Sequence, residues 1–148
     1  MAHHYPLTLS WSGNTLADPY IRDAVANAEG KVSLPVSSAA EFGGSVQRWN
    51  PEDLLGAALA TCHMLTFLAL CAKSKIEIIG YEDQAVSVVD TVEKVTSVTE
   101  IHLNPAIRVA PGTNVEKVVE LFGKAHKYCF VANSLKTKVL MKPAISEG

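Results

Sequence analysis

Three cysteines, at positions 62, 71 and 129, are the residues of this chain with the richest chemistry. Cysteine is often buried as a small inert hydrophobe, so core packing is the first interpretation of each. Cys71 fits that interpretation, because it follows Cys62 by nine positions and would face the opposite side of a helix. Cys62 and Cys129 instead have polar neighbours in the sequence. A functional pair of these two thiols is a hypothesis that competes with plain core packing.

Histidines raise two other possibilities, a metal centre and a Cys–His hydrolase. The chain has no Cys-x-x-Cys or His-x-x-x-His pair, and the adjacent Cys62 and His63 diverge on a helix, which argues against a closed zinc site. A hydrolase would need His63, His102 or His126 as its base, and no local context specifies one of them. Each histidine is therefore interpreted as a core or surface residue. We expect neither a metal nor another cofactor, since no cofactor motif is present.

The composition is that of a soluble globular protein. The chain has 148 residues, of which 48% are hydrophobic and 19% charged, and this size predicts one domain spanning residues 1–148. A formal net charge of −2 and scattered Lys and Arg residues argue against nucleic acid or an anionic membrane as a partner. The first residues lack the apolar core of a secretory signal, so we expect a reducing cytoplasmic setting.

One segment, Leu54–Ala72, has no Asp, Glu, Lys or Arg and approaches the length of a membrane span. A buried central helix has the same composition. We favour the buried helix because His63 would lie in the middle of the membrane and because the chain has no second segment of this kind. A helix that is apolar on nearly every side must be enclosed by other elements or by a second subunit.

The element that carries Cys62 begins with a strong helix signal. Asn50 can cap a helix, Pro51 suits its first position, and the acidic Glu52 and Asp53 complement its dipole. Before this point, short alternating or β-branched segments separated by turns predict strands at residues 7–11 and 31–36.

The elements that carry Cys129 follow a β-prone region at residues 81–95. Alternation over Val98–Val109 predicts one half-buried strand, which Pro105 places near an edge or a bulge. Asn114 then caps a helix, and Cys129 follows at its end or in the next turn. The predicted buried stripe of this helix is Val115, Val118, Val119, Phe122 and His126. A last strand is expected at residues 137–145, and the order of elements predicts an α+β domain.

Two segments resemble the OsmC/Ohr peroxidase family. Residues 50–55 (NPEDLL) and 60–63 (ATCH) are similar to its helix start, where the reactive cysteine follows the glutamate by ten positions. Residues 125–134 (AHKYCFVANS) are similar to its second cysteine segment. The order of elements agrees over nearly the whole chain. The resemblance implies an OsmC-like fold and an intertwined homodimer with its site at the interface.

The resemblance also implies a two-cysteine peroxidase. Cys62 would attack an organic hydroperoxide, or hydrogen peroxide, as a thiolate. The resulting sulfenic acid would condense with Cys129 to a disulfide, which an external dithiol would reduce. An arginine from the N-terminal β region would stabilise the thiolate, and Glu52 would position this arginine. Arg22 is the better match by position, and Arg48 is the second candidate.

Helix geometry limits how such an arginine could act. Ten residues of a straight helix advance about 15 Å and turn about 280°, so Glu52 cannot contact Cys62 directly. We therefore expect either a break in the helix near Gly56 or an arginine supplied by a second subunit.

Two functions of other classes remain open on the sequence. A cysteine-dependent acyl hydrolase would keep Cys62 as its nucleophile, and its thioester turnover would survive the loss of Cys129. A non-catalytic dimeric module that binds a small apolar ligand would consume no peroxide.

Overall fold

The first 54 residues form one of two compact units in the computed structural model, which describes residues 1–148 in full. Its sheet has three antiparallel strands in sequential order: β1 (Thr8–Ser10), β2 (Ala24–Asn27) and β3 (Leu34–Val36). A 3-10 turn, η1 (Ala40–Phe42), follows. The strands predicted at residues 7–11 and 31–36 are confirmed, although each is shorter than the patterned segment.

This N-terminal unit has no apolar core of its own. Every buried hydrophobic residue of the protein follows residue 54, whereas Leu9, Leu16 and Val32 are exposed. A small three-stranded sheet needs a packed hydrophobic face to be stable. The unit therefore cannot be expected to fold by itself.

The long helix α1 (Pro51–Lys73) begins where the sequence predicts. The Asn50 side chain accepts a hydrogen bond from the Asp53 N–H at 2.8 Å, and the Asp53 carboxylate accepts one from the Asn50 N–H at 3.4 Å. The helix continues without interruption through Gly56, so the first of the two alternatives, a break in the helix near Gly56, is wrong. Gly56 instead permits a close approach, because a Cβ at this position would lie 2.6 Å from the Ser87 hydroxyl oxygen.

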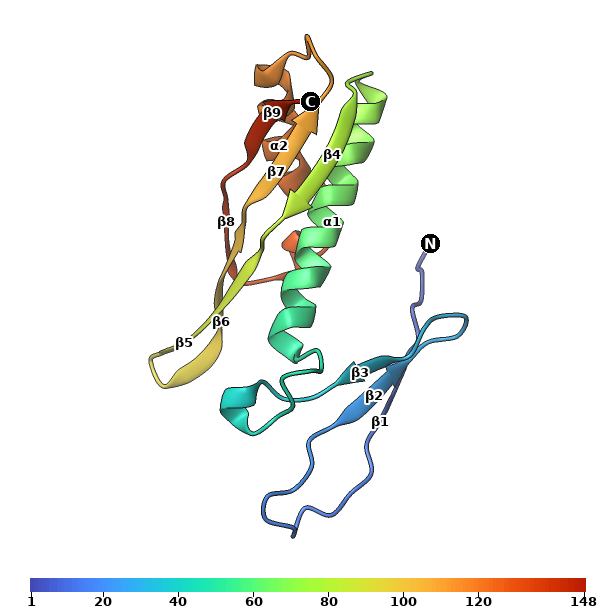
Figure 1. Cartoon of the computed structure of the whole chain (residues 1–148), viewed down its shortest axis with the longest axis vertical. Coiled ribbons are helices and arrows are strands. Elements are labelled where there is room, and N and C mark those ends of the chain that lie inside the picture. Colours follow the sequence, from blue (N-terminus) through green and yellow to red (C-terminus); the bar gives the residue numbers. More distant parts are fainter. The chain divides into compact units, whose positions relative to one another are not determined.

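The strands of the C-terminal unit, residues 55–148, form two three-stranded sheets. One sheet has the order β4-β7-β9 and the other β5-β6-β8. In both sheets the first two strands are antiparallel and the last two parallel. In Figure 1, β4 runs on into β5, β6 into β7 and β8 into β9. The strands are β4 (Ile78–Asp83), β5 (Val86–Val92), β6 (Val95–Leu103), β7 (Pro105–Val109), β8 (Lys138–Met141) and β9 (Ala144–Glu147).

A break at Asn104 divides the single strand predicted over Val98–Val109 into part of β6 and β7. The Asn104 N–H donates a hydrogen bond to Asp83 Oδ1 at 2.7 Å, and its side-chain amide donates one to the Gln84 carbonyl at 3.1 Å. These bonds take the place of a continuous ladder. The predicted last strand is divided in the same way, into β8 and β9, at residues 142–143, where Pro143 has no N–H to donate.

The predicted alternation along β6 and β7 is confirmed. Its buried face consists of Ile101, Leu103, Ile107 and Val109. Pro105 does not lie at an edge, because β7 is the middle strand of its sheet. The proline is tolerated there because it is the first residue of the strand, next to the break.

The second helix, α2 (Val115–Tyr128), is capped by Asn114 as predicted, whose side chain accepts a hydrogen bond from the Lys117 N–H at 3.2 Å. The predicted stripe was partly wrong, because Val115 and Val119 are exposed. The buried stripe is Val118, Leu121, Phe122 and Ala125. Apolar residues occupy two overlapping faces of this helix, and the sequence pattern does not show which face meets the core.

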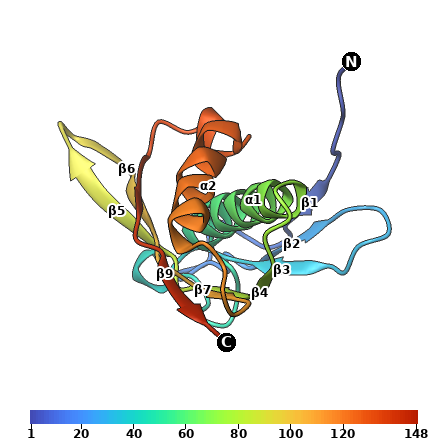
Figure 2. The ribbon, with the colours of Figure 1, turned by 90° about the horizontal axis from the view of Figure 1, so that it is seen from above.

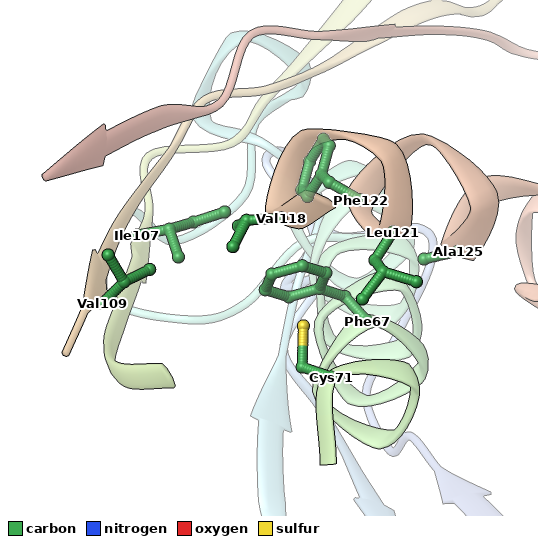
Figure 3. Packing of buried hydrophobic residues seen from close by; sticks show 8 residues of the cluster. All are labelled: Phe67, Cys71, Ile107, Val109, Val118, Leu121, Phe122 and Ala125. Carbon is green, nitrogen blue, oxygen red and sulfur yellow. The ribbon is translucent and has the colours of Figure 1, made fainter. Parts of the chain in front are cut away.

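Helices α1 and α2 lie on the same side of the β4-β7-β9 sheet (Figure 2). The two helices and the sheet share a hydrophobic core. Helix α1 contributes Phe67 and Cys71, β7 contributes Ile107 and Val109, and α2 contributes its buried stripe (Figure 3).

By length and composition α1 could cross a membrane. One face of α1 is nevertheless buried against the core, through Leu59, His63, Phe67 and Cys71. Leu65, on another face, is 57% exposed. The prediction of a core helix is confirmed, but a single chain does not enclose this helix on every side.

Candidate redox site at Cys62 and Cys129

Cys62 lies in the middle of α1, and Cys129 is the residue at which α2 ends. Cys129 is 0% exposed and belongs to a second core cluster with Leu59, Ile101 and Leu103. Cys62 is partly exposed, packs against the same cluster, and is a free thiol like Cys129. The structure therefore brings together the two cysteines that the sequence predicted as a pair.

The pKa of Cys62 lies below that of an ordinary cysteine. Burial by itself raises this pKa, but hydrogen bonds to the sulfur outweigh burial. The backbone N–H of Val131, the Cys129 thiol and the backbone N–H of Phe130 are three of the donors. The Thr66 hydroxyl is the fourth. Because such bonds favour the charged form, Cys62 is the better candidate for the nucleophilic thiol of the pair.

The pKa of Cys129 is shifted in the opposite direction. Burial is the largest cause of its raised pKa, and the neighbouring Cys62 sulfur raises the pKa further. The Ala132 N–H donates to Cys129 Sγ at 3.4 Å, which favours the thiolate but does not outweigh burial. The Cys62 thiol thus ionises more readily than the Cys129 thiol, and the two thiols are suited to different roles.

The turn after α2 supplies most of these donors. The chain leaves the helix at Cys129 in an extended conformation and enters a 3-10 turn, η2 (Ala132–Ser134). The Asn133 amide donates to the Lys127 carbonyl at 3.0 Å, and the Ser134 hydroxyl donates to the carbonyl of residue 130 at 2.8 Å. These two side chains fix the turn, so that successive backbone N–H groups of residues 130–132 face the sulfur atoms.

Thr66 is a site residue that the sequence analysis missed. It stands one helical turn after Cys62, and its hydroxyl donates to the Cys62 carbonyl at 2.8 Å. The same hydroxyl is within reach of the Cys62 sulfur. Since a hydroxyl has one proton, it can turn from the carbonyl to the sulfur when the thiolate forms. The i,i+4 spacing is visible in the sequence and is the signal that could have found it.

Cys71 takes no part in this site. It is 1% exposed, lies beside Phe67 in the other core cluster (Figure 3), and burial raises its pKa to about 11. Its interpretation as a packing residue is confirmed.

No histidine is among the groups that shift the pKa of either site cysteine. The ring of His63 is 0% exposed, 4.5 Å from the ring of Phe122 and 6.4 Å from that of His126. Burial, and then the charge of His126, lower the pKa of His63 to about 4. His102 pairs with Glu100 at 2.9 Å. A Cys–His hydrolase would therefore lack a placed base, and no three metal-binding side chains come together.

The remaining predicted site residues belong to the N-terminal unit. The Arg22 guanidinium donates to the Tyr20 carbonyl at 3.1 Å and lies 4.1 Å from the centre of the Tyr20 ring. Arg48 pairs with the Asp23 carboxylate at 3.3 Å. Glu52 lies in the first turn of α1. Arg22, which has no carboxylate partner, is the better candidate to bind another anion, but its place beside Cys62 stays a prediction.

The fold has known counterparts. The family described as OsmC-like protein matches residues 43–143, which include both site cysteines. The uncharacterized protein YmaD of Bacillus subtilis is 24% identical over 141 residues, covering 93% of this chain and 89% of YmaD. An OsmC-like protein of unknown function from Vibrio cholerae superposes with a TM-score of 0.89 at 24% identity, covering 97% of this chain and 100% of that one. An organic hydroperoxide resistance protein OsmC from Legionella pneumophila has a TM-score of 0.73 at 21% identity, covering 99% and 98%. The expected α+β fold is thereby confirmed.

Proposed function

Because the chain belongs to the OsmC-like protein family, we propose that it is a thiol-dependent peroxidase that reduces organic hydroperoxides, and hydrogen peroxide as a further substrate. One observation carries this proposal: Cys62 and Cys129 lie next to each other, and the pKa of Cys62 is lowered while that of Cys129 is raised. A two-cysteine mechanism needs one thiol that ionises readily and a second thiol beside it that can attack the sulfenic acid. The name of the structural neighbour from Legionella pneumophila supports the same substrate class.

In the first step, the Cys62 thiolate attacks an oxygen of the hydroperoxide. An S–O bond forms and the O–O bond breaks, so the sulfur is oxidised by two electrons to a sulfenic acid. The other oxygen leaves as an alkoxide and takes a proton from water to become an alcohol. The backbone N–H groups of Val131 and Phe130 favour the attacking anion over the thiol.

In the second step, the Cys129 sulfur attacks the sulfenic sulfur of Cys62. The S–S bond forms, the S–O bond breaks, and the leaving hydroxide combines with the Cys129 proton to form water. The charge on Cys62, which raises the pKa of Cys129 in the reduced protein, is gone after the first step. Cys129 therefore gives up its proton more easily at the stage where it must attack.

An external dithiol then reduces the disulfide, and a reducing cytoplasm would keep the pair ready for the next turnover. Arg22, positioned by Glu52, would stabilise the Cys62 thiolate and orient the peroxide, with Arg48 as the second candidate. Since α1 is unbroken, we propose that a second subunit takes part. It would cover the face of α1 that carries Leu65 and the N-terminal unit, which has no core of its own.

The test is a thiol titration before and after one equivalent of cumene hydroperoxide, with the bridge mapped by mass spectrometry. Two of the three thiols should disappear into a Cys62–Cys129 disulfide while Cys71 stays reduced. Cys71→Ala is the matched control and should consume peroxide like the wild type, whereas Cys62→Ser should consume none. A bridge that contains Cys71 would contradict the mechanism, and no consumption by the wild type would favour a ligand-binding module.

A further inference from the structure

The two sulfurs of the pair differ in access. Cys129 is 0% exposed and packs among Leu59, Ile101 and Leu103. Cys62 is partly exposed. Since the residues around Cys129 belong to its own chain, a second subunit could bury the pair further but could not uncover Cys129.

This difference matters when a disulfide between the two cysteines is reduced from outside. Thiol–disulfide exchange places the attacking sulfur, the attacked sulfur and the leaving sulfur nearly in line, and it depends on access to the attacked sulfur. Because Cys129 is 0% exposed, an attack on it from solvent would have to displace residues of its core cluster. An attack on Cys62 needs no such opening of the core within its own chain, because this residue is partly exposed.

We propose that the external dithiol attacks Cys62 rather than Cys129, so that the mixed disulfide forms on Cys62. This inference rests on the proposed function, because it concerns the reduction of the proposed disulfide. The reductant thiolate forms an S–S bond to Cys62, the Cys62–Cys129 bond breaks, and Cys129 leaves and takes a proton from water. The second thiol of the reductant then attacks the reductant's own sulfur and releases Cys62, so two electrons pass from the dithiol to the protein.

Leaving-group acidity acts in the opposite direction at the first exchange. The lower pKa of Cys62 makes it the better leaving thiol, which would favour attack on Cys129. That preference amounts to less than about tenfold in rate for each unit of pKa difference. Opening a buried core position lowers the reactive population by roughly 10³-fold or more. Access therefore decides the first exchange, and the acidity of Cys62 assists the second, in which Cys62 leaves.

The burial of Cys129 also favours a dithiol as the reductant. Once Cys129 has left, its raised pKa keeps most of it as a thiol, which attacks the mixed disulfide slowly. The intermediate on Cys62 then persists until a second thiol reaches it. A second thiol on the same reductant molecule is already close by, so it resolves the intermediate faster than a separate monothiol does.

The experiment starts from protein whose disulfide has been formed with diamide, without any peroxide. A few equivalents of 2-mercaptoethanol are added at pH 7, the exchange is stopped with acid, and the remaining thiols are alkylated with iodoacetamide after denaturation. Peptide mapping should show mercaptoethanol on Cys62 and the alkyl group on Cys129 in at least about tenfold excess over the reverse. An even distribution, or an excess of mercaptoethanol on Cys129, would overturn the inference.

Matched core variants test whether access is the cause. Ile101→Ala loosens the cluster around Cys129 and should move part of the adduct to Cys129. Ile107→Ala makes the same truncation in the other cluster and should leave the adduct on Cys62. Equal shifts in both variants would count against access to Cys129 as the cause.

The use of diamide keeps this inference separate from the proposed function. If peroxide forms no bridge but mercaptoethanol adds to Cys62 of the diamide-treated protein, the proposed function fails and the inference stands. If peroxide forms the bridge and the adduct lies on Cys129, the inference fails and the proposed function stands. Failure of diamide to join the two cysteines would overturn both.

Discussion

His63 should make the wild-type protein less stable at acidic pH, and replacement of His63 by leucine should abolish this effect. The imidazole is 0% exposed in the core, and burial, followed by the charge of His126, lowers its pKa from 6.5 to about 4. The unfolded chain exposes the same ring with an ordinary pKa. As the pH falls below 6.5, the unfolded state therefore takes up a proton that the folded state resists.

The pKa values give the size and the pH range of this effect. The difference between a pKa of 6.5 in the unfolded chain and about 4 in the folded protein corresponds to about 3 kcal/mol of unfolding free energy. The contribution is complete above pH 6.5, falls progressively between pH 6.5 and pH 4, and changes no further below pH 4. Because His63 packs against the α2 residues Phe122 and His126, its protonation would destabilise the contact between the two helices.

Urea unfolding at several pH values between 7 and 4, at one protein concentration, measures this contribution. Between pH 7 and pH 4, the unfolding free energy of His63→Leu should fall by about 3 kcal/mol less than that of the wild type. His102→Gln is the matched control, because it removes a histidine that is not buried in the core, and it should follow the wild type closely. Parallel pH profiles for the wild type and His63→Leu would refute the assignment of a buried neutral imidazole.

Three further changes test the site itself. Cys129→Ser should leave the first attack intact but let Cys62 gain a second oxygen, because no thiol traps the sulfenic acid, and loss of the first turnover in stopped-flow traces would refute this. Thr66→Val should raise the pKa at which Cys62 is alkylated, since one hydrogen-bond donor is lost, and Thr66→Ser should keep the wild-type value; equal values for both would exclude the role of the hydroxyl. Arg22→Ala should raise the same pKa and slow peroxide reduction by roughly tenfold or more, because charge stabilisation and substrate orientation are lost together; if Arg48→Ala does so instead, the choice of arginine is wrong.

Local signals in the sequence were sufficient for the positions of the helices. Asn50 and Asn114 were identified as caps because a cap depends only on the next few residues, and both make the expected hydrogen bonds. Pro105 indicated an edge or a bulge at this point of the strand, but the division into two strands at Asn104 was not predicted. It depends on hydrogen bonds to residues 83 and 84, which the sequence pattern of the strand does not contain.

The cysteine pair shows the same limit. No local pattern says that Cys62 and Cys129 meet, and only the similarity of two separate segments to one family predicted it. The N–H groups that lower the pKa of Cys62 belong to the backbone of Val131 and Phe130. Because nearly every residue type has a backbone N–H, the sequence does not reveal which ones act as donors. Thr66 was detectable by its spacing, but many threonines stand one turn from another residue, so the spacing alone does not distinguish it.

The parallel pairing of β8 with β6 has a consequence for how a newly made chain acquires its reactivity. The pairing joins residues far apart in the chain, and the Thr137 hydroxyl donates to the Val98 carbonyl across a separation of 39 residues. Such long-range pairings are slow to form, because the intervening chain must be ordered before they contribute. The turn that holds Cys129 lies within this intervening segment, and it is anchored at its far end only when β8 has docked. Until α2, its turn and the last strands have packed against α1, we expect Cys62 to lack both its donors and its partner, so that a half-folded chain would contain three ordinary thiols.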